Sequence, residues 1–135
     1  MMTTHARGTF DATITTQPPE DKGAAASVGR ISLDKQFCGD LDASSTGQML
    51  AVGTAVEGSA GYVAMEHVAG RHHAHSGTFA LQHSGTMTRG TPHLTMTVVP
   101  DSGTAHLVGL VGTPAIDSVD GQHTYDFAYT LLEAS

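Results

Sequence analysis

The sequence predicts an all-β protein that folds as a single antiparallel closed β-barrel of about eight strands. Residue types that favour strands, Thr and Val above all, recur in short alternating stretches, and 16 glycines separate these stretches. The length of 135 residues suits one domain, which we expect to span 1–135. We prefer a barrel to an open sandwich, because closure removes the exposed edges that a small, weakly charged sheet would present.

The first elements lie on either side of an unpatterned stretch. Residues 1–7 read as a loose N-terminal tail, and apolar and polar side chains alternate over 8–16, which predicts a strand. Residues 17–26 contain two prolines and no periodicity, and we expect a mobile loop. Alternation returns over 27–44, where Gly39 predicts a bulge or a sharp bend.

The middle of the chain predicts a turn, a third strand and a hairpin. The small residues of 45–47 predict a turn, and 48–57 follows as a strand. Two further alternating stretches, 61–72 and 77–88, form the hairpin, with its turn near 74–76.

The last third continues in the same manner. Residues 93–99 alternate as a strand, and 104–112 is the one place where a helical turn is expected. A short strand at 113–119 leads to Asp120-Gly121, which is the best hairpin signal, because a type I′ turn needs positive φ at both central residues. The strand at 122–132 closes the barrel.

Composition excludes several classes of function. The net charge of −7 opposes binding to a phosphate backbone, so we expect no nucleic-acid partner. No stretch approaches the roughly 20 apolar residues that span a bilayer, and the N-terminus lacks the pattern of a signal peptide. The single cysteine, Cys38, permits no intrachain disulfide and is expected to be a buried, inert thiol. We therefore expect a cytoplasmic bacterial protein without membrane contact.

Several stretches together resemble a known family. They are GRISLDKQFCGDLDASSTG (29–47), EGSAGYVAMEHVAG with GTFALQHSGTMTRG (within 57–90), VVPDSGTAHLVGLVG (98–112) and DGQHTYDFAYTL (120–131). They resemble the bacterial domain of unknown function 3224, a resemblance that covers nearly the whole chain and implies an allene-oxide-cyclase-like β-barrel. The segment SGTAHLVGLVG also looks like a turn of allene oxide cyclases and dirigent proteins, which bind small apolar molecules. None of their catalytic residues matches a position here, so the resemblance implies the fold and leaves the activity open.

The hairpin of 61–88 carries the main candidate site. Phe79 and Leu81 predict the inward face of its second strand, and His83 shares that face. If Tyr62 and Glu66 also point inward, a phenol, a carboxylate and an imidazole meet in one apolar cavity. Such a group can do acid–base work on a bound ligand. It can equally be a hydrogen-bonded polar plug inside a filled barrel.

The orientation of the first hairpin strand stays open at this point. Val63, Met65 and His67 form an inward face that is as plausible as the one containing Glu66. In that register Glu66 would lie in solvent and the candidate site would not exist.

Three histidines near the hairpin tip, His72, His73 and His75, form a second candidate. A zinc site needs three or four ligands at a rigid spacing, and His73 and His75 have that spacing only if the strand continues. A turn is expected there and no cysteine accompanies them. We therefore expect an exposed polar tip, with no metal and no cofactor.

Lys35 and the aromatic row of the last strand complete the candidates. Lys35 lies on an apolar face, where it is either an amine of lowered pKa or a rim residue whose stem packs while its ammonium reaches water. Tyr125, Phe127 and Tyr129 share one face and are most simply core. The residues we expect to contact a ligand are Tyr62, Glu66, His83, Lys35, Tyr125, Phe127 and Tyr129.

Three functions fit these observations. The leading hypothesis is a barrel that binds a small apolar or amphipathic molecule in its lumen. The second is an isomerase, cyclase or lyase that uses Glu66 and His83 as acid–base groups and Tyr62 as an orienting donor. The third is a structural homo-oligomer with a filled interior, suggested by apolar residues on both sides of 48–57 and 94–99. A cavity lined by these three side chains favours the first two, and a solid interior favours the third.

Overall fold

The computed structural model describes residues 3–17 and 28–131. These form one antiparallel sheet of eight strands in the order β6-β5-β4-β3-β2-β1-β8-β7. The elements are β1 (Thr4–Gln17), β2 (Val28–Gly39), β3 (Leu41–Gly53), β4 (Ala60–His72), β5 (His75–Thr88), β6 (Thr91–Val98), the 3-10 turn η2 (Ala105–Leu107), β7 (Leu110–Val119) and β8 (Gln122–Leu131).

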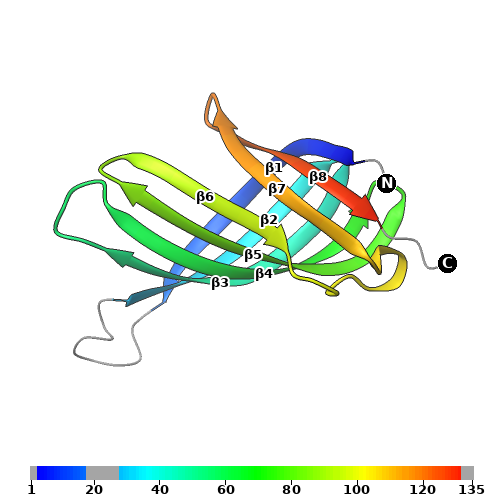
Figure 1. Ribbon diagram of the computed structural model, residues 1–135, viewed down its shortest axis with the longest axis horizontal. Helices are drawn as coiled ribbons and strands as arrows, with labels where there is room; N and C mark the ends of the chain where they lie inside the picture. The colour runs from blue at the N-terminus through cyan, green and yellow to red at the C-terminus, as the bar shows by residue number, and fades with distance from the viewer. Residues whose placement is uncertain (1–2, 18–27, 132–135) are drawn as a thin grey trace.

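The sheet curls into a nearly closed barrel, as the alternation of the sequence predicts (Figure 1). The two edge strands, β6 and β7, come side by side, with no backbone ladder between them in the described part of the chain. Every other neighbouring pair forms a continuous antiparallel ladder. The barrel therefore has one seam, along β6 and β7.

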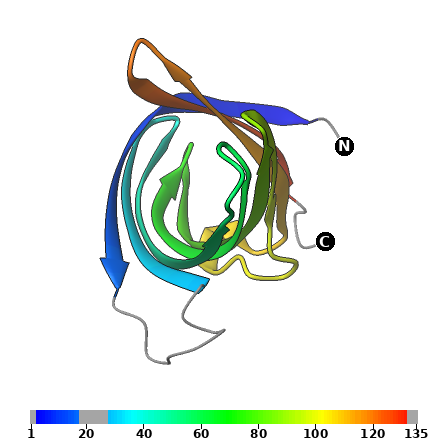
Figure 2. The same ribbon diagram turned by 90° about the vertical axis from the view of Figure 1, so that its left-hand side faces the viewer.

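The two ends of the barrel differ. Figure 2 looks into the end formed by the β3–β4 and β5–β6 turns. The β4–β5 turn and η2 lie at the opposite end. Packed aromatic and leucine side chains fill the interior towards that second end, and the space left among Lys35, Leu81 and Phe127 is only about 10 Å³. The lumen is thus solid in one half, and any room for a ligand must lie in the other.

The expected loose tail at 1–7 is wrong for its described part from Thr4 onward. β1 begins at Thr4 and pairs with β8, and Ala6 lies opposite Phe127 with no exposed surface. The prediction failed because Ala6 is the only apolar side chain in THAR, so no alternation shows. The expected loop at 17–26 lies outside the described residues except for Gln17, which ends β1.

The chain reverses at Gly39-Asp40, within a stretch that we expected to be one strand with a bulge or a sharp bend at Gly39. Gly39 has φ 105°, which only glycine adopts readily, so the bend is a tight turn between β2 and β3. Residues 45–47 were expected to form a turn and instead lie within β3. Gly47 is required by its close approach to Glu66 on β4, and Ser45 hydrogen-bonds to the same residue, so neither serves chain reversal.

The remaining boundaries agree more closely with the predictions. Asp120 and Gly121 have φ of 51° and 82°, so the turn with positive φ at both positions is confirmed. The helical turn is the short η2, and β7 begins at Leu110, earlier than expected. The expectation of a buried thiol is wrong, because Cys38 is exposed. Among the described residues, no helix is long and apolar enough to cross a membrane.

Candidate functional site

The structure decides which face of β4 points into the barrel. Glu66 is 2% exposed and Val68 is fully buried, whereas Val63 and Met65 are about half exposed, at 54% and 50%. The face containing Glu66 is therefore the inward one, and the alternative register is wrong. His83 on β5 is also buried, so the carboxylate and the imidazole meet inside the barrel as the first interpretation predicts.

Glu66 is the centre of a buried polar cluster in which both carboxylate oxygens accept hydrogen bonds. Ser45 Oγ donates to Oε1 at 2.6 Å. Lys35 Nζ and His83 Nε2 both approach Oε2, at 3.0 Å and 2.9 Å. The Glu66 side chain has no exposed surface, and the Lys35 and His83 side chains have 8% and 3%. Lys35 is therefore a buried ion-pair partner and not a rim residue.

These contacts hold Glu66 ionised. Desolvation alone would raise the pKa of the Glu66 carboxyl, but the hydrogen bond from His83, the charge of Lys35 and the hydrogen bond from Ser45 outweigh it. The net effect lowers the pKa of Glu66 to about 2. A carboxylate that is saturated with donors and stays charged at neutral pH is poorly suited to exchange protons with a ligand.

Glycines opposite the functional side chains give them room. Gly47 lies across from Glu66, and a Cβ there would stand 2.3 Å from the Met65 carbonyl oxygen and 3.0 Å from the Glu66 side chain. Gly85 lies across from Tyr62, and a Cβ there would meet the phenol ring at 2.3 Å. The ring of Tyr62 therefore lies over the bare backbone of β5, the arrangement in which an aromatic side chain covers a cross-strand glycine.

Tyr62 is the member of the predicted trio that reaches a cavity. Its hydroxyl lies 3.5 Å from His83 Nδ1, on the side of the imidazole opposite Glu66. Its ring contacts a cavity of about 340 Å³ at the end seen in Figure 2. The lining is mostly apolar and consists of Met49, Ala51, Ala60, Gly61, Tyr62, Gly85, Thr86, Met87, Pro92, His93 and Leu94. We call this cavity the open-end pocket.

The strand register orders these groups along the lumen. Ala60 pairs with Met87 at the rim, and Tyr62 pairs with Gly85 one layer further in. His83 follows in the next inward layer, and Glu66 in the one after. The hydroxyl, the imidazole and the carboxylate thus form a hydrogen-bonded chain that runs from the pocket floor into the filled half of the barrel.

The other expected ligand contacts lie elsewhere. The Tyr125 hydroxyl donates to the carbonyl of Cys38 at 2.9 Å and accepts from the amide of Leu41 at 2.8 Å, which ties β8 to the β2–β3 turn. Phe127 and Tyr129 pack in the core. Of the seven expected contacts, Tyr62 alone lines the open-end pocket. Sequence reasoning missed Met87 and Leu94, inner-face residues that the rim leaves 42% and 38% exposed.

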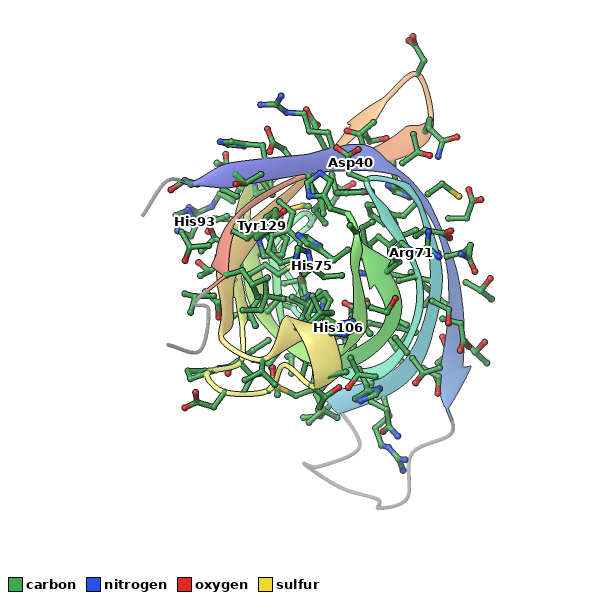
Figure 3. All side chains as sticks on the ribbon, turned by 90° about the vertical axis from the view of Figure 1, so that its right-hand side faces the viewer. Asp40, Arg71, His75, His93, His106 and Tyr129 are labelled. Carbon is green, nitrogen blue, oxygen red and sulfur yellow. The ribbon has the colours of Figure 1, made fainter. Side chains whose placement is uncertain are left out.

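The hairpin tip is not the exposed polar tip that the sequence predicts, because His72 points into the barrel. His72 is 1% exposed and neither ring nitrogen has a hydrogen-bond partner. His73 bonds to the Tyr129 hydroxyl and approaches Asp40 at 3.6 Å. Figure 3 looks onto this end, with His75 and Tyr129 inside the ring of strands. Within the described residues no group of three His, Cys, Asp or Glu is placed to hold a metal ion.

Comparison with known proteins assigns the family. The chain matches the model of DUF3224, described as a protein of unknown function, over residues 6–129. This chain belongs to the DUF3224 family. The family resemblance inferred from the sequence motifs is thereby confirmed.

A solved structure supports the same assignment for this DUF3224 protein. It is the crystal structure of a protein with unknown function from the DUF3224 family of Shewanella oneidensis MR-1. The two chains are 44% identical with a TM-score of 0.90, and the match covers 98% of this chain and 100% of the other. No curated protein matches the chain. The expected homo-oligomer stays a prediction.

Proposed function

We propose that this DUF3224 protein binds a small, largely apolar molecule in the open-end pocket. The observation that carries the proposal is the pocket itself, a cavity of about 340 Å³ with a mostly apolar lining and one phenol on its floor. Sites for small ligands are concave, mostly apolar and furnished with a few polar groups, and they begin at roughly 300 Å³.

The exposure of inner-face side chains supports the same proposal. Met87 and Leu94 face the lumen and yet remain 42% and 38% exposed. Apolar surface in a concavity is costly to hydrate, and a ligand that covers it regains that free energy. The opposite half of the lumen is filled, so the ligand would occupy only this end of the barrel.

The contacts of Glu66 favour binding over catalysis by that residue. Its two oxygens are occupied by Ser45, Lys35 and His83, and no part of its side chain is exposed. Of Tyr62, His83 and Glu66, only Tyr62 lines the open-end pocket. Burial, followed by the nearby Glu66 charge, raises the pKa of that phenol. Tyr62 therefore stays protonated at neutral pH and serves as a hydrogen-bonding group.

The proposal is tested by filling the pocket. Wild-type protein should enhance the fluorescence of the uncharged apolar dye N-phenyl-1-naphthylamine in a saturable titration. Ala51→Trp places an indole in the pocket and should reduce dye affinity at least about tenfold, which corresponds to 1.4 kcal/mol. The matched control is Val63→Trp, which places the same indole on the outer face of β4.

Two outcomes would contradict the proposal. One is a dye affinity in Ala51→Trp equal to that of Val63→Trp, which would place the dye outside the pocket. The other is the absence of saturable binding in folded wild-type protein. Native mass spectrometry of protein purified gently from its own host complements the titration, because a retained molecule would identify the natural ligand directly.

A further inference from the structure

The hydrogen-bond chain below the open-end pocket determines whether the Tyr62 hydroxyl donates or accepts a hydrogen bond in the pocket. Its inner end is Glu66, which is ionised and therefore only an acceptor. The group facing Glu66 Oε2 at 2.9 Å is His83 Nε2. Two acceptors cannot share a hydrogen bond, so Nε2 carries a hydrogen.

Charge balance then determines the other nitrogen of His83. The ammonium of Lys35, 3.0 Å from Glu66, already offsets the single negative charge of the cluster. A second proton on His83, whose side chain is 3% exposed, would add a buried positive charge without a counter-charge. The imidazole is therefore neutral, and a neutral imidazole with a hydrogen on Nε2 has a lone pair on Nδ1.

Nδ1 in turn orients the phenol. It lies 3.5 Å from the Tyr62 hydroxyl oxygen and accepts the only hydrogen that this hydroxyl has. The hydroxyl hydrogen thus points inward along the chain, and the lone pairs of the oxygen remain for the pocket. Towards the open-end pocket, which Tyr62 lines, the phenol oxygen is consequently an acceptor, whereas the sequence-based hypothesis made Tyr62 an orienting donor.

We propose that the open-end pocket selects an apolar molecule carrying a hydrogen-bond donor, such as an alcohol, a phenol or an N–H group, which donates to Tyr62 Oη. This inference rests on the proposed function and specifies its ligand class. It gives the buried cluster a role in recognition, because Glu66, Lys35 and His83 are positioning residues that set the direction of one hydrogen bond without touching the ligand.

Three naphthalene probes of similar size test whether the pocket prefers a ligand that donates a hydrogen bond or one that only accepts. They are 2-naphthol, which can donate, and 2-methoxynaphthalene and 2-acetylnaphthalene, which can only accept. Dissociation constants are measured by calorimetry at about pH 8, above the ordinary range of an imidazole and below that of a phenol. Each probe is titrated into wild-type protein and into Tyr62→Phe, which keeps the ring over Gly85 and removes only the hydroxyl. Circular dichroism verifies that the variant is folded.

Tyr62→Phe should weaken binding of 2-naphthol by about threefold to tenfold, the range for one hydrogen bond, and leave the two acceptor probes within about twofold. Equal losses for all three probes, or a loss confined to 2-acetylnaphthalene, would overturn the donor inference while leaving the pocket in place. Absence of binding by all three probes to the wild-type protein, together with a failed dye titration, would overturn the pocket and the inference with it. Because the comparison is between variants, differences in probe hydrophobicity cancel.

Discussion

The wild-type protein should lose stability in mild acid because of His72, and replacing His72 by leucine should abolish that part of the loss. His72 ends β4 inside the barrel, with ring centroids of Tyr129 at 4.1 Å and Phe127 at 4.9 Å. Its nitrogens have no partners and the residue is 1% exposed. Burial, followed by the charges of His73 and His75, lowers the pKa of His72 from 6.5 to about 4, while Asp40 acts in the opposite sense.

The sign of the effect follows from proton binding. Between pH 6.5 and about 4, the unfolded chain protonates His72 and the folded protein does not. The free energy of unfolding therefore falls as pH falls through this window and stops falling below it. A difference of about 2.5 units in pKa corresponds to roughly 3 kcal/mol in total, of which about 2 kcal/mol is lost between about pH 7 and about pH 5. Glu66 acts in a lower window, because its stabilisation is lost as pH falls from 4.5 towards 2.

Urea unfolding at about pH 7 and about pH 5 measures the effect. With an m-value of about 2 kcal/mol per molar, the contribution of His72 moves the wild-type midpoint down by about 1 M. His72→Leu should lack that contribution, and its midpoint should shift by about 1 M less. The control is His67→Leu on the exposed face of the same strand, which should keep the full acid sensitivity. Equal acid losses in His72→Leu and wild type would refute the assignment of this titration to His72.

Three further predictions concern the buried cluster, the pocket floor and the β2–β3 turn. Glu66→Gln leaves the Lys35 ammonium buried without a counter-charge and should cost about 3–5 kcal/mol in urea unfolding, much of it recovered when Lys35→Met is added. Gly85→Ala puts a methyl group within 2.3 Å of the Tyr62 ring and should cost about 1–3 kcal/mol of stability and shift the Tyr62 ring signals in NMR spectra. Tyr125→Phe unpairs the backbone groups that its hydroxyl contacts and should cost about 1–3 kcal/mol, measured in the same way.

Each of these has an outcome that would count against it. A Glu66→Gln variant as stable as wild type would mean that the ion pair makes no net contribution to stability. Lys35→Met alone would then also leave the free energy of unfolding unchanged. Unchanged Tyr62 ring signals in Gly85→Ala would show that the ring does not lie over β5. For Tyr125→Phe, a loss no larger than that of an exposed hydroxyl deletion, such as Thr46→Val on β3, would remove the turn-anchoring role.

The strands were predictable wherever side chains alternate on a two-sided sheet. Asp120-Gly121 was readable as a turn because its backbone requirement is local. Thr4 to Arg7 was not readable as a strand, because its pairing with β8 is made by backbone groups and by one buried alanine. Ser45 to Gly47 looked like a turn because small residues serve two purposes, chain reversal and room for a neighbour, and only the position of Glu66 shows which one applies.

The candidate site was predictable in its residue types but not in its contacts. Glu66 and His83 could be paired in advance only by assuming the inward face of β4, since both faces carry apolar residues. Lys35 and Ser45 are 31 and 21 residues from Glu66 in the chain. They meet it only because β3 pairs with β4, and β2 follows on the other side of β3 in the curled sheet. No local pattern encodes a contact over that distance.

By itself, the sequence determined the fold class, the family and most turns, because alternation, glycine spacing and turn residues act over a few neighbouring positions. The tertiary structure decided that β6 and β7 meet without a ladder, that one half of the lumen is filled, and that a phenol stands between a pocket and a buried ion pair. These properties depend on how far the sheet curls and on which side chains share a layer. They result from packing among residues that are distant in the chain.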